Sequence, residues 1–595
     1  MIKENQIQKK GWWIGLIAGL IIINILAAQF HYRFDLTSEK RYSLSGPTKV
    51  LLSKLGEPVR IEVFLKGDFP AGFKKLANSV DEFLQEAKEY GKGNLQILFV
   101  DPFKIAGDSA EAFIKRNRDQ IASDSSANEN EVTSLYTQFF IDSIASHYGI
   151  NPYTLQAPGK VGDEQIEKRV LPGAVIYFKD TSIGVNLLQG IGSFGTEPEE
   201  LKTFYNNVEA SMEYKFASAI QKITSNERPN IAYAMGHGEA WGFNVDDAVR
   251  TLLGNYNFDT INLKQAPYIP EQINALVLLK PNLPFKDAEK LKIDQYIMNG
   301  GKVFWMIDNM YAEFDSLRNS DGFIAFDRGL NLEDLLFNYG IRINQTLLQD
   351  MQCDKLPQTS GESQQQRLVD WPFFPILNGS DHPISKNLDG VRALFPTTLD
   401  TVEATGIKKT VLLQSSNNAR LLNAPTKIDF EFLQIAPDQN LFRQKNIPVA
   451  FLLEGRFKSL YTGRVPGAIA DSLNRMRMPF KTVAEKEGKM IIVSDGDIAI
   501  NQYSPSTGPL PMGMNLFTRY TFANKDFFTN SLEYLLNPTD ILQARSKEFT
   551  LRLLDPKRVN EQKATWQFIN IALPILIIIL LGIIYQQIRK RKYAA

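Results

Sequence analysis

Two long apolar stretches lie near the ends of the chain. Residues 11–30 contain no charged side chain, and Trp12 and Trp13 stand near their start. A helix of about 20 residues rises about 30 Å, which is the thickness of the hydrocarbon core of a bilayer. The apolar part of a cleaved signal peptide is usually only about 7–15 residues long. The pattern therefore predicts an uncleaved transmembrane helix over residues 11–30.

A second span is predicted over residues 564–588, which also carry no charge. Asn570 and Pro574 lie inside it, and a membrane helix tolerates them where neighbours satisfy the freed polar groups. The basic tail at 589–595 favours the cytoplasmic side. Because two spans place both ends on one side, we expect a two-pass protein of the bacterial inner membrane with a periplasmic body.

The body starts with a strand–helix–strand pattern. Residues 59–65 begin with alternating apolar and polar positions, apolar residues then recur at helical spacing from Phe73 to Ala87, and residues 95–100 form the next apolar run. This order predicts two parallel strands joined by a right-handed crossover, as in a thioredoxin-like start. A redox site of that fold would need two cysteines at residues 67–70. The residues there are Gly-Asp-Phe-Pro, so no thiol chemistry is expected.

A second alternation begins near residue 228. Strands are predicted at 231–235, 258–263, 275–279 and 303–307, with helices near 245–253 and 286–298. Strands that alternate with helices are typical of a doubly wound, mostly parallel sheet. Strands at 411–414, 449–453 and 490–494 and a helix near 527–536 either extend this sheet or form a third lobe.

The expected fold class is thus α/β, anchored in the membrane at both ends. The predicted segments are a cytoplasmic tail (1–10), a transmembrane helix (11–30), an N-terminal α/β unit (31–105), a linker with a hairpin and a long helix (106–227), a doubly wound α/β domain (228–345), its extension or a third lobe (346–540), a juxtamembrane linker (541–563), a second transmembrane helix (564–588) and a basic cytoplasmic tail (589–595).

Composition narrows the possible functions. Lys and Arg number 66 and so do Asp and Glu, so the chain has no net charge and nucleic acid is not an expected partner. Cys353 is the single cysteine, which rules out an intramolecular disulfide and a zinc site built on several thiolates. The four histidines, His31, His147, His237 and His382, are too widely spaced for a His-Glu-x-x-His site.

Motifs for nucleotide binding and hydrolysis are weak or missing. Residues 190–195 match Gly-x-Gly-x-x-Gly, but Thr196 to Glu200 follow as a capping box with an acidic first turn, which would repel a phosphate. The sequence contains no phosphate-binding loop of the Gly-x-x-x-x-Gly-Lys-Ser/Thr type and no Gly-x-Ser-x-Gly elbow. We therefore expect no cofactor, no metal and no ATP hydrolysis by this chain itself.

The most informative local feature is the run from Met235 to Glu239. It follows the first strand of the wound sheet, where such folds place ligands, and His237, Glu239 and Trp241 could bind a polar group there. The alternative is a glycine-rich turn in which His237 caps nearby backbone. Asp495 and Asp497 also follow a strand, and they suggest either a cation site or simple turn chemistry.

Four features together resemble a known family. They are the N-terminal anchor followed by Leu-Thr-Ser-Glu-Lys-Arg-Tyr-Ser-Leu-Ser at 36–45, the strand at 60–65, the turn at 236–239, and the C-terminal anchor with its basic tail. On these residues the chain resembles the GldG family of gliding-motility-associated, substrate-binding or auxiliary proteins of ABC transporters.

The resemblance implies a multi-span permease and a cytoplasmic ATPase as partners, GldF and GldA in that family. It also implies a sheet similar to class I glutamine amidotransferases over residues 228–308. Those enzymes need a cysteine at a strand-to-helix elbow, whereas Cys353 lies in a stretch that reads as a polar loop. The resemblance therefore implies a non-catalytic subunit whose ligand is unknown.

Two other functions stay open at this point. One is a membrane-tethered envelope hydrolase that uses His237 and Glu239. The other is a structural envelope scaffold without coupling to an ATPase.

Overall fold

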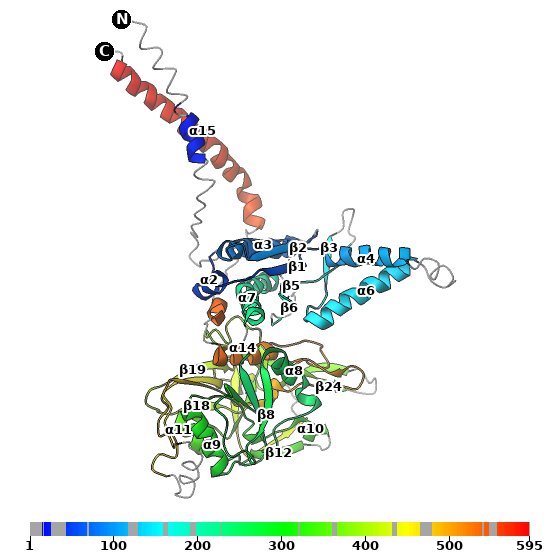
Figure 1. Ribbon diagram of the computed structural model, residues 1–595, viewed down its shortest axis with the longest axis vertical. Coiled ribbons are helices and arrows are strands. Elements are labelled where there is room, and N and C mark those ends of the chain that lie inside the picture. Colours follow the sequence, from blue (N-terminus) through cyan, green and yellow to red (C-terminus); the bar gives the residue numbers. More distant parts are fainter. Residues whose placement is uncertain are drawn as a thin grey trace. The chain divides into compact units, whose positions relative to one another are not determined.

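The computed structural model describes residues 15, 17–24, 43–67, 69, 71–116, 129–158, 165–190, 198–225, 228–318, 322–359, 366–430, 437–464, 479–537, 541–546 and 556–593 (Figure 1). The chain forms two compact units, Met1–Phe549 and Thr550–Ala595.

The N-terminal part of the first unit is built on a four-stranded sheet in the order β2-β1-β5-β6. Strands β1 (Val59–Val63) and β2 (Leu95–Phe99) are parallel, and α3 (Ala71–Tyr90) connects them, which confirms the predicted pair. The predicted hairpin is formed by β5 (Gly173–Phe178) and β6 (Thr181–Asn186). Because β5 pairs with β1, the predicted segments 31–105 and 106–227 share one sheet.

Helix α7 (Pro198–Thr224) joins this sheet to the rest of the unit. Phe216 lies against Phe83 of α3, with ring centroids 5.6 Å apart. Residues of α7 such as Val208 and Phe216 belong to the core of the N-terminal sheet, whereas Tyr214 and Ala217 belong to a core of the larger sheet. One helix thus buries side chains in two hydrophobic cores.

Two helices lie side by side at the edge of the N-terminal part (Figure 1), α4 (Pro102–Arg116) and α6 (Glu129–Tyr148). Helix α4 covers the start of the predicted linker segment (106–227), and Ala106, Ala110 and Ile114 are buried on one of its faces.

The larger sheet has ten strands in the order β15-β16-β19-β22-β23-β10-β9-β7-β8, with β17 paired to β16. Its parallel half consists of β8, β7, β9, β10 and β23, and its antiparallel half begins at β22. The later strands of the predicted 346–540 segment therefore extend the same sheet.

The sheet is covered on both faces, as the predicted doubly wound pattern requires. Alternate strand residues point to opposite cores: Tyr233 and Val277 join the core that contains α8 and α14, whereas Ala232 and Leu276 join the core that contains α9 and α11. All five residues of the central strand β9 are buried, as expected for a strand covered on two sides.

The remaining elements of the first unit are α2 (Gly46–Ser53), β3 (Tyr153–Pro158), β4 (Gln165–Val170), β7 (Asn230–Met235), η1 (Phe243–Val245), α8 (Asp246–Asn255), β8 (Asn257–Asn262), β9 (Ala275–Leu279), α9 (Asp287–Met298), β10 (Lys302–Met306), β11 (Met310–Tyr311), α10 (Phe314–Arg318), β12 (Gly322–Asp327), α11 (Glu333–Tyr339), β13 (Ile341–Ile343), β14 (Thr346–Asp350), β15 (Cys353–Thr359), β16 (Gln366–Gly379), β17 (Val391–Arg392), β18 (Leu399–Thr401), β19 (Ile407–Gln414), β20 (Ala419–Asn423), β21 (Thr426–Asp429), η2 (Gln439–Leu441), β22 (Pro448–Gly455), β23 (Gly488–Val493), η3 (Gly496–Ala499), β24 (Tyr503–Ser504), β25 (Gly508–Pro509), α14 (Asn524–Leu536) and η4 (Ile541–Ser546).

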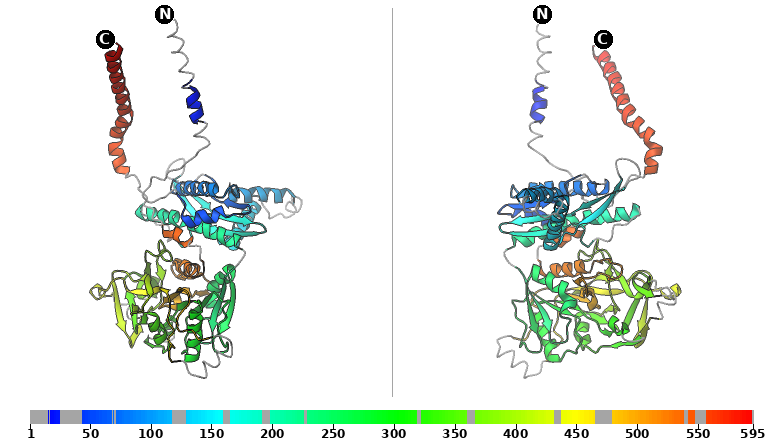
Figure 2. Two further views of the ribbon diagram at one scale, coloured as in Figure 1. Left: turned by 60° about the vertical axis from the view of Figure 1, so that its left-hand side comes forward. Right: turned by 90° about the vertical axis from the view of Figure 1, so that its right-hand side faces the viewer.

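The second unit contains α15 (Pro556–Tyr593), shown in orange to red in Figure 2. Its stretch Gln562–Arg591 has a mean hydropathy of 2.7 and is long and apolar enough to cross a membrane. This stretch covers the predicted second span. Of the predicted first span, residues 15 and 17–24 are described, and they are helical; the other residues of that span lie outside the described part of the chain.

Candidate functional site

The parallel half of the large sheet brings polar side chains to one edge. The register pairs Val303 with Met490 and with Leu276, so β9, β10 and β23 end at the same level. The chain order of the strands reverses between β7 and β9, and ligands of such sheets bind outside the carboxyl ends of the strands at that position. His237, Lys280, Asp308 and Asp495 each follow one of these four strands.

The structure places His237 and Glu239, two of the three predicted ligand residues, next to each other. The His237 ring is fully buried and stacks on Phe285 at a centroid distance of 3.7 Å. Its Nδ1 lies 3.5 Å from a Glu239 oxygen, and its Nε2 lies 3.7 Å from a Glu289 oxygen. These distances are too long for good hydrogen bonds, and neither ring nitrogen has a hydrogen-bond partner among the described residues.

The turn that carries His237 depends on glycine. Gly238 has a φ of +70°, and a Cβ at this position would lie 1.9 Å from the Oδ1 of Asn282. The backbone N–H groups of Asn282 and Leu283 both donate to the His237 carbonyl at 2.9 Å, and the His237 N–H donates to Glu239 at 2.7 Å. The glycine-rich turn that was predicted as the alternative is therefore also present, with Glu239 rather than the imidazole bonded to the backbone.

Trp241, the third predicted ligand residue, has different surroundings. Its ring packs on Tyr233 at a centroid distance of 5.5 Å, and 51% of the residue is exposed. Among the described residues, the Trp241 ring therefore contacts Tyr233, whereas the His237 ring contacts a different residue, Phe285.

A second cluster surrounds Lys280. Its ammonium lies 3.1 Å from Asp308, 3.1 Å from Glu313 and 2.5 Å from Asp497. Arg328 pairs with the other oxygen of Glu313 at 2.6 Å. The cluster thus joins residues that follow β9, β10 and β23 with a residue next to β11.

Asp495 and Asp497, for which the sequence suggested either a cation site or turn chemistry, form a turn beside a third carboxylate. The Asp497 N–H donates to Asp495 at 2.7 Å, which is ordinary turn chemistry. Oxygens of Asp308, Asp495 and Asp497 also lie within 4.8 Å of one another, which is the donor set of a hard cation such as Mg²⁺. Because the Lys280 ammonium already pairs with two of these carboxylates, it takes the place of such a cation.

The pKa shifts of this cluster follow from burial and mutual charge. Burial, with Asp308 and Asp497, raises the pKa of Asp495 well above its ordinary value. Burial also raises the pKa of Asp497 to about 7, against the opposing effect of Lys280. Burial works against the charge of Lys280, but Asp308, Asp497 and Glu313 raise its pKa above the ordinary value. Lys280 therefore stays protonated and cannot act as a nucleophile at neutral pH.

Sequence reasoning missed Lys280, Asp308, Glu313 and Glu289. Their partners are distant in the chain, since Lys280 and Asp497 are separated by 217 positions. The sequence does hold a sign of this cluster. Lys280 directly follows the strand β9, and Asp308 comes two positions after β10, so both lie at the carboxyl ends of predicted strands.

Cys353 lies away from this edge, in the strand β15 at the other end of the large sheet. Cys353 was predicted in a polar loop, and that prediction is wrong, since it is the first residue of β15 and pairs with Pro375 of β16. Burial, followed by Asp370, Asp350 and Asp354, raises the pKa of its thiol, so the reactive thiolate is scarce. Of the Gly-x-Gly-x-x-Gly stretch, residues 191–195 lie outside the described residues.

Comparisons with known proteins give two family matches. Residues 228–531, just over half of the chain, match a family described as "ABC-type uncharacterized transport system". Residues 38–177 match a domain of unknown function, DUF7088. No curated protein matches the chain.

One similar solved structure is described as "mmIFT52 N-terminal domain". It is 12% identical, and the alignment covers 52% of this chain and 97% of that one. The TM-score is 0.29, so this likeness supports no conclusion about fold or function.

Proposed function

The chain belongs to the family of ABC-type uncharacterized transport systems, and on that premise we propose that it is a non-catalytic, substrate-binding-type auxiliary subunit of an ABC transporter complex. A multi-span permease and a cytoplasmic ATPase are its partners in this proposal. The resemblance of residues 36–45 to the GldG family extends the proposal to a complex that acts in gliding motility.

The observation that carries the non-catalytic role is the mutual pairing of charges at the carboxyl edge. A general base or nucleophile has to reach its substrate. His237 is fully buried beneath Phe285, and the Lys280 side chain is 14% exposed and paired with three carboxylates. His237 is thus shielded by burial and Lys280 is held by its ion pairs, which favours an auxiliary role over a hydrolase that uses His237 and Glu239.

The proposed topology has both ends in the cytoplasm and the body in the periplasm. It is supported by α15, whose apolar stretch from Gln562 to Arg591 has no buried residue in its most hydrophobic window, and by the charge-free residues 11–30. Reporter fusions after Asp101 and after Lys592 test it. We expect the first to give a periplasmic signal and the second a cytoplasmic signal, and the same signal from both would contradict two spans.

The proposed partnership is tested by co-purification. A tagged full-length chain, extracted from its native membrane in mild detergent, should retain a multi-span permease and a cytoplasmic ATPase. A matched variant has both spans replaced by polyleucine-type helices, which keeps the protein in the membrane. Asn570 and the Gly15/Gly19 pair offer polar and close-packing contacts to other membrane helices. We therefore expect this variant to lose the permease and to abolish gliding.

One result would refute this partnership, and another would refute the docking of the spans. Failure of the native chain to retain either component would refute it. Retention by both forms would place the contacts in the body rather than in the spans.

A further inference from the structure

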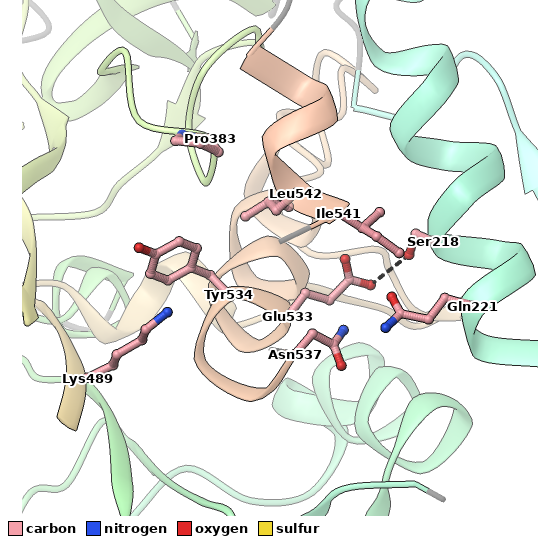
Figure 3. A pocket seen from close by; sticks show the side chains of 9 residues that line it. All are labelled: Ser218, Gln221, Pro383, Lys489, Glu533, Tyr534, Asn537, Ile541 and Leu542. Carbon is pink, nitrogen blue, oxygen red and sulfur yellow. Dashed lines mark hydrogen bonds between the residues drawn. The ribbon is translucent and has the colours of Figure 1, made fainter. Parts of the chain in front are cut away.

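A buried polar junction lies between the two sheets of the first unit, where α7, α14 and η4 meet. Figure 3 shows part of it, with Ser218 and Gln221 of α7 facing Glu533, Asn537 and Ile541. The junction also holds other charged side chains, which are Lys215, Lys222, Asp526 and Arg545.

Glu533 is fully compensated. It pairs with Lys222, accepts a hydrogen bond from Ser218 at 3.1 Å, and accepts another from Tyr214. Burial alone would raise the pKa of Glu533, but Lys222 and the two hydroxyl groups hold it below its ordinary value. The ion pair of Lys222 and Glu533 therefore leaves no net charge.

Next to this pair is a cavity of about 120 Å³. A single water molecule needs about 10–15 Å³ of cavity volume, so this cavity has room for a small molecule. Side chains of α7, α14 and η4 line it together with the end of β6, residues 183–186. Asp526 forms part of the wall and packs against Gly190, where an added Cβ would lie 2.4 Å from its carboxylate.

Arg545 is the unusual residue of this cavity. It is 4% exposed, its Nε has no hydrogen-bond partner, and no carboxylate of the described residues lies within 4.0 Å of its guanidinium. The guanidinium lies over the face of the Tyr214 ring, 5.3 Å from its centroid, and Asp526 and Lys215 act on it only from beyond ion-pair distance. A buried charge without an ion-pair partner destabilises the folded state, and proteins keep such groups mostly at functional sites.

Lys215 adds a second cation to the wall. Its ammonium donates to the carbonyls of Leu187 and Gln189 at 2.6 and 2.7 Å, and so it is held at the cavity. Burial lowers its pKa to about 7 in spite of Asp526. Below about pH 7, where Lys215 is protonated, two cations face the Asp526 carboxylate, and the cavity has an excess of positive charge.

We propose that this cavity binds a small anion, a carboxylate or an inorganic oxyanion, with the guanidinium of Arg545 as its main contact and Lys215 as a second. A guanidinium presents two parallel N–H groups that match two oxygens of either kind of anion. The site goes beyond the proposed function and does not depend on it, because it rests on the cavity and the unpaired guanidinium alone.

The position of the site gives such an anion a structural consequence. Its two cations come from α7, which packs in the N-terminal core, and from η4, which ends ten positions before α15 begins at Pro556. A bound anion would draw these two elements together. It would thereby stabilise the junction between the two sheets of the first unit.

Isothermal titration of the full-length protein in detergent micelles tests the proposal. Inorganic phosphate and acetate are titrated separately at constant ionic strength set with KCl, and the two arms distinguish an oxyanion from a carboxylate. We expect saturable binding of at least one of them. Arg545→Gln should weaken it at least tenfold, and Lys215→Met should also weaken it. The control Arg443→Gln removes an exposed arginine of the same body and should change nothing.

Two results would overturn the proposal. One is the absence of saturable binding by the native chain for both anions. The other is unchanged affinity in a folded Arg545→Gln variant, with folding checked by circular dichroism. If Arg545→Gln does not fold, Lys215→Met decides in its place, and unchanged affinity in that variant then refutes the site. Loss of the permease in co-purification has no bearing on this measurement.

Discussion

The Lys280 cluster allows a sharp test of the charge pairing at the carboxyl edge. Lys280→Met keeps most of the side-chain volume but removes the only described cation that pairs directly with Asp308 and Asp497. Their side chains are 9% and 10% exposed, so water cannot replace the lost ammonium. Removal of one partner from a buried ion pair costs about 3–5 kcal/mol, and we expect a loss of that size in the free energy of unfolding at pH 8.

Two comparisons separate this effect from a packing defect. Lys408→Met removes a lysine that is 74% exposed and lies 3.9 Å from Glu454, and such surface pairs contribute less than about 1 kcal/mol. Asp308→Asn added to Lys280→Met removes one of the uncompensated charges and should restore part of the loss.

The pH dependence gives a third readout. Carboxylates left without their cation bind protons more tightly in the folded state than in the unfolded state, so lower pH favours the folded state. The destabilisation by Lys280→Met should therefore shrink between pH 8 and pH 5. Urea unfolding of the full-length protein in micelles, followed by tryptophan fluorescence, measures it. A loss below 1 kcal/mol at pH 8, or one that does not change with pH, would refute the reasoning.

Three further predictions concern single side chains. Gly238→Ala should lower the free energy of unfolding by at least about 2 kcal/mol, because its Cβ would meet Asn282 at 1.9 Å. Gly254→Ala, whose Cβ would have no atom within 4 Å, should leave that free energy unchanged or raise it slightly. The midpoints of urea unfolding measure both changes. Cys353→Ser should leave motility and protein level unchanged, and the native thiol should react slowly with iodoacetamide at pH 7, because burial raises its pKa; rapid alkylation or lost gliding would contradict this. Burial raises the pKa of Asp497 to about 7. Proton binding to Asp497 therefore stabilises the folded state fully below about pH 4, and this contribution is lost as pH rises through 7. Asp497→Asn should therefore flatten the fall in stability from pH 5 to 8, and an unchanged slope would count against it.

Local periodicity predicted most elements of the parallel half of the large sheet. The strand predicted at 275–279 is β9, and the helix predicted at 286–298 is α9, which begins at Asp287. These elements bury continuous apolar runs or one helical face, so their signal lies within a few neighbouring residues. The parallel pair β1 and β2 was predictable for the same reason.

Contacts between distant segments could not be predicted in this way. Nothing near residue 174 indicates that β5 pairs with β1, and nothing near residue 490 indicates that β23 lies beside β10. The same holds for the site: His237 and Glu239 are neighbours in sequence, but Phe285 and Glu289 reach them only through the packing of α9. Arg545 is separated from Tyr214 by more than half of the chain.

The two polar regions of the first unit differ in how their charges are balanced, and this difference indicates where a ligand would act. At the carboxyl edge, Lys280 has three carboxylate partners, so an incoming ligand would have to break pairs that already satisfy both signs. At the α7–η4 junction, Arg545 has no hydrogen-bond partner at its Nε among the described residues. An anion there would add a charge-assisted bond without breaking one, which is the more favourable exchange. An anion therefore gains more free energy at the junction than at the Lys280 cluster.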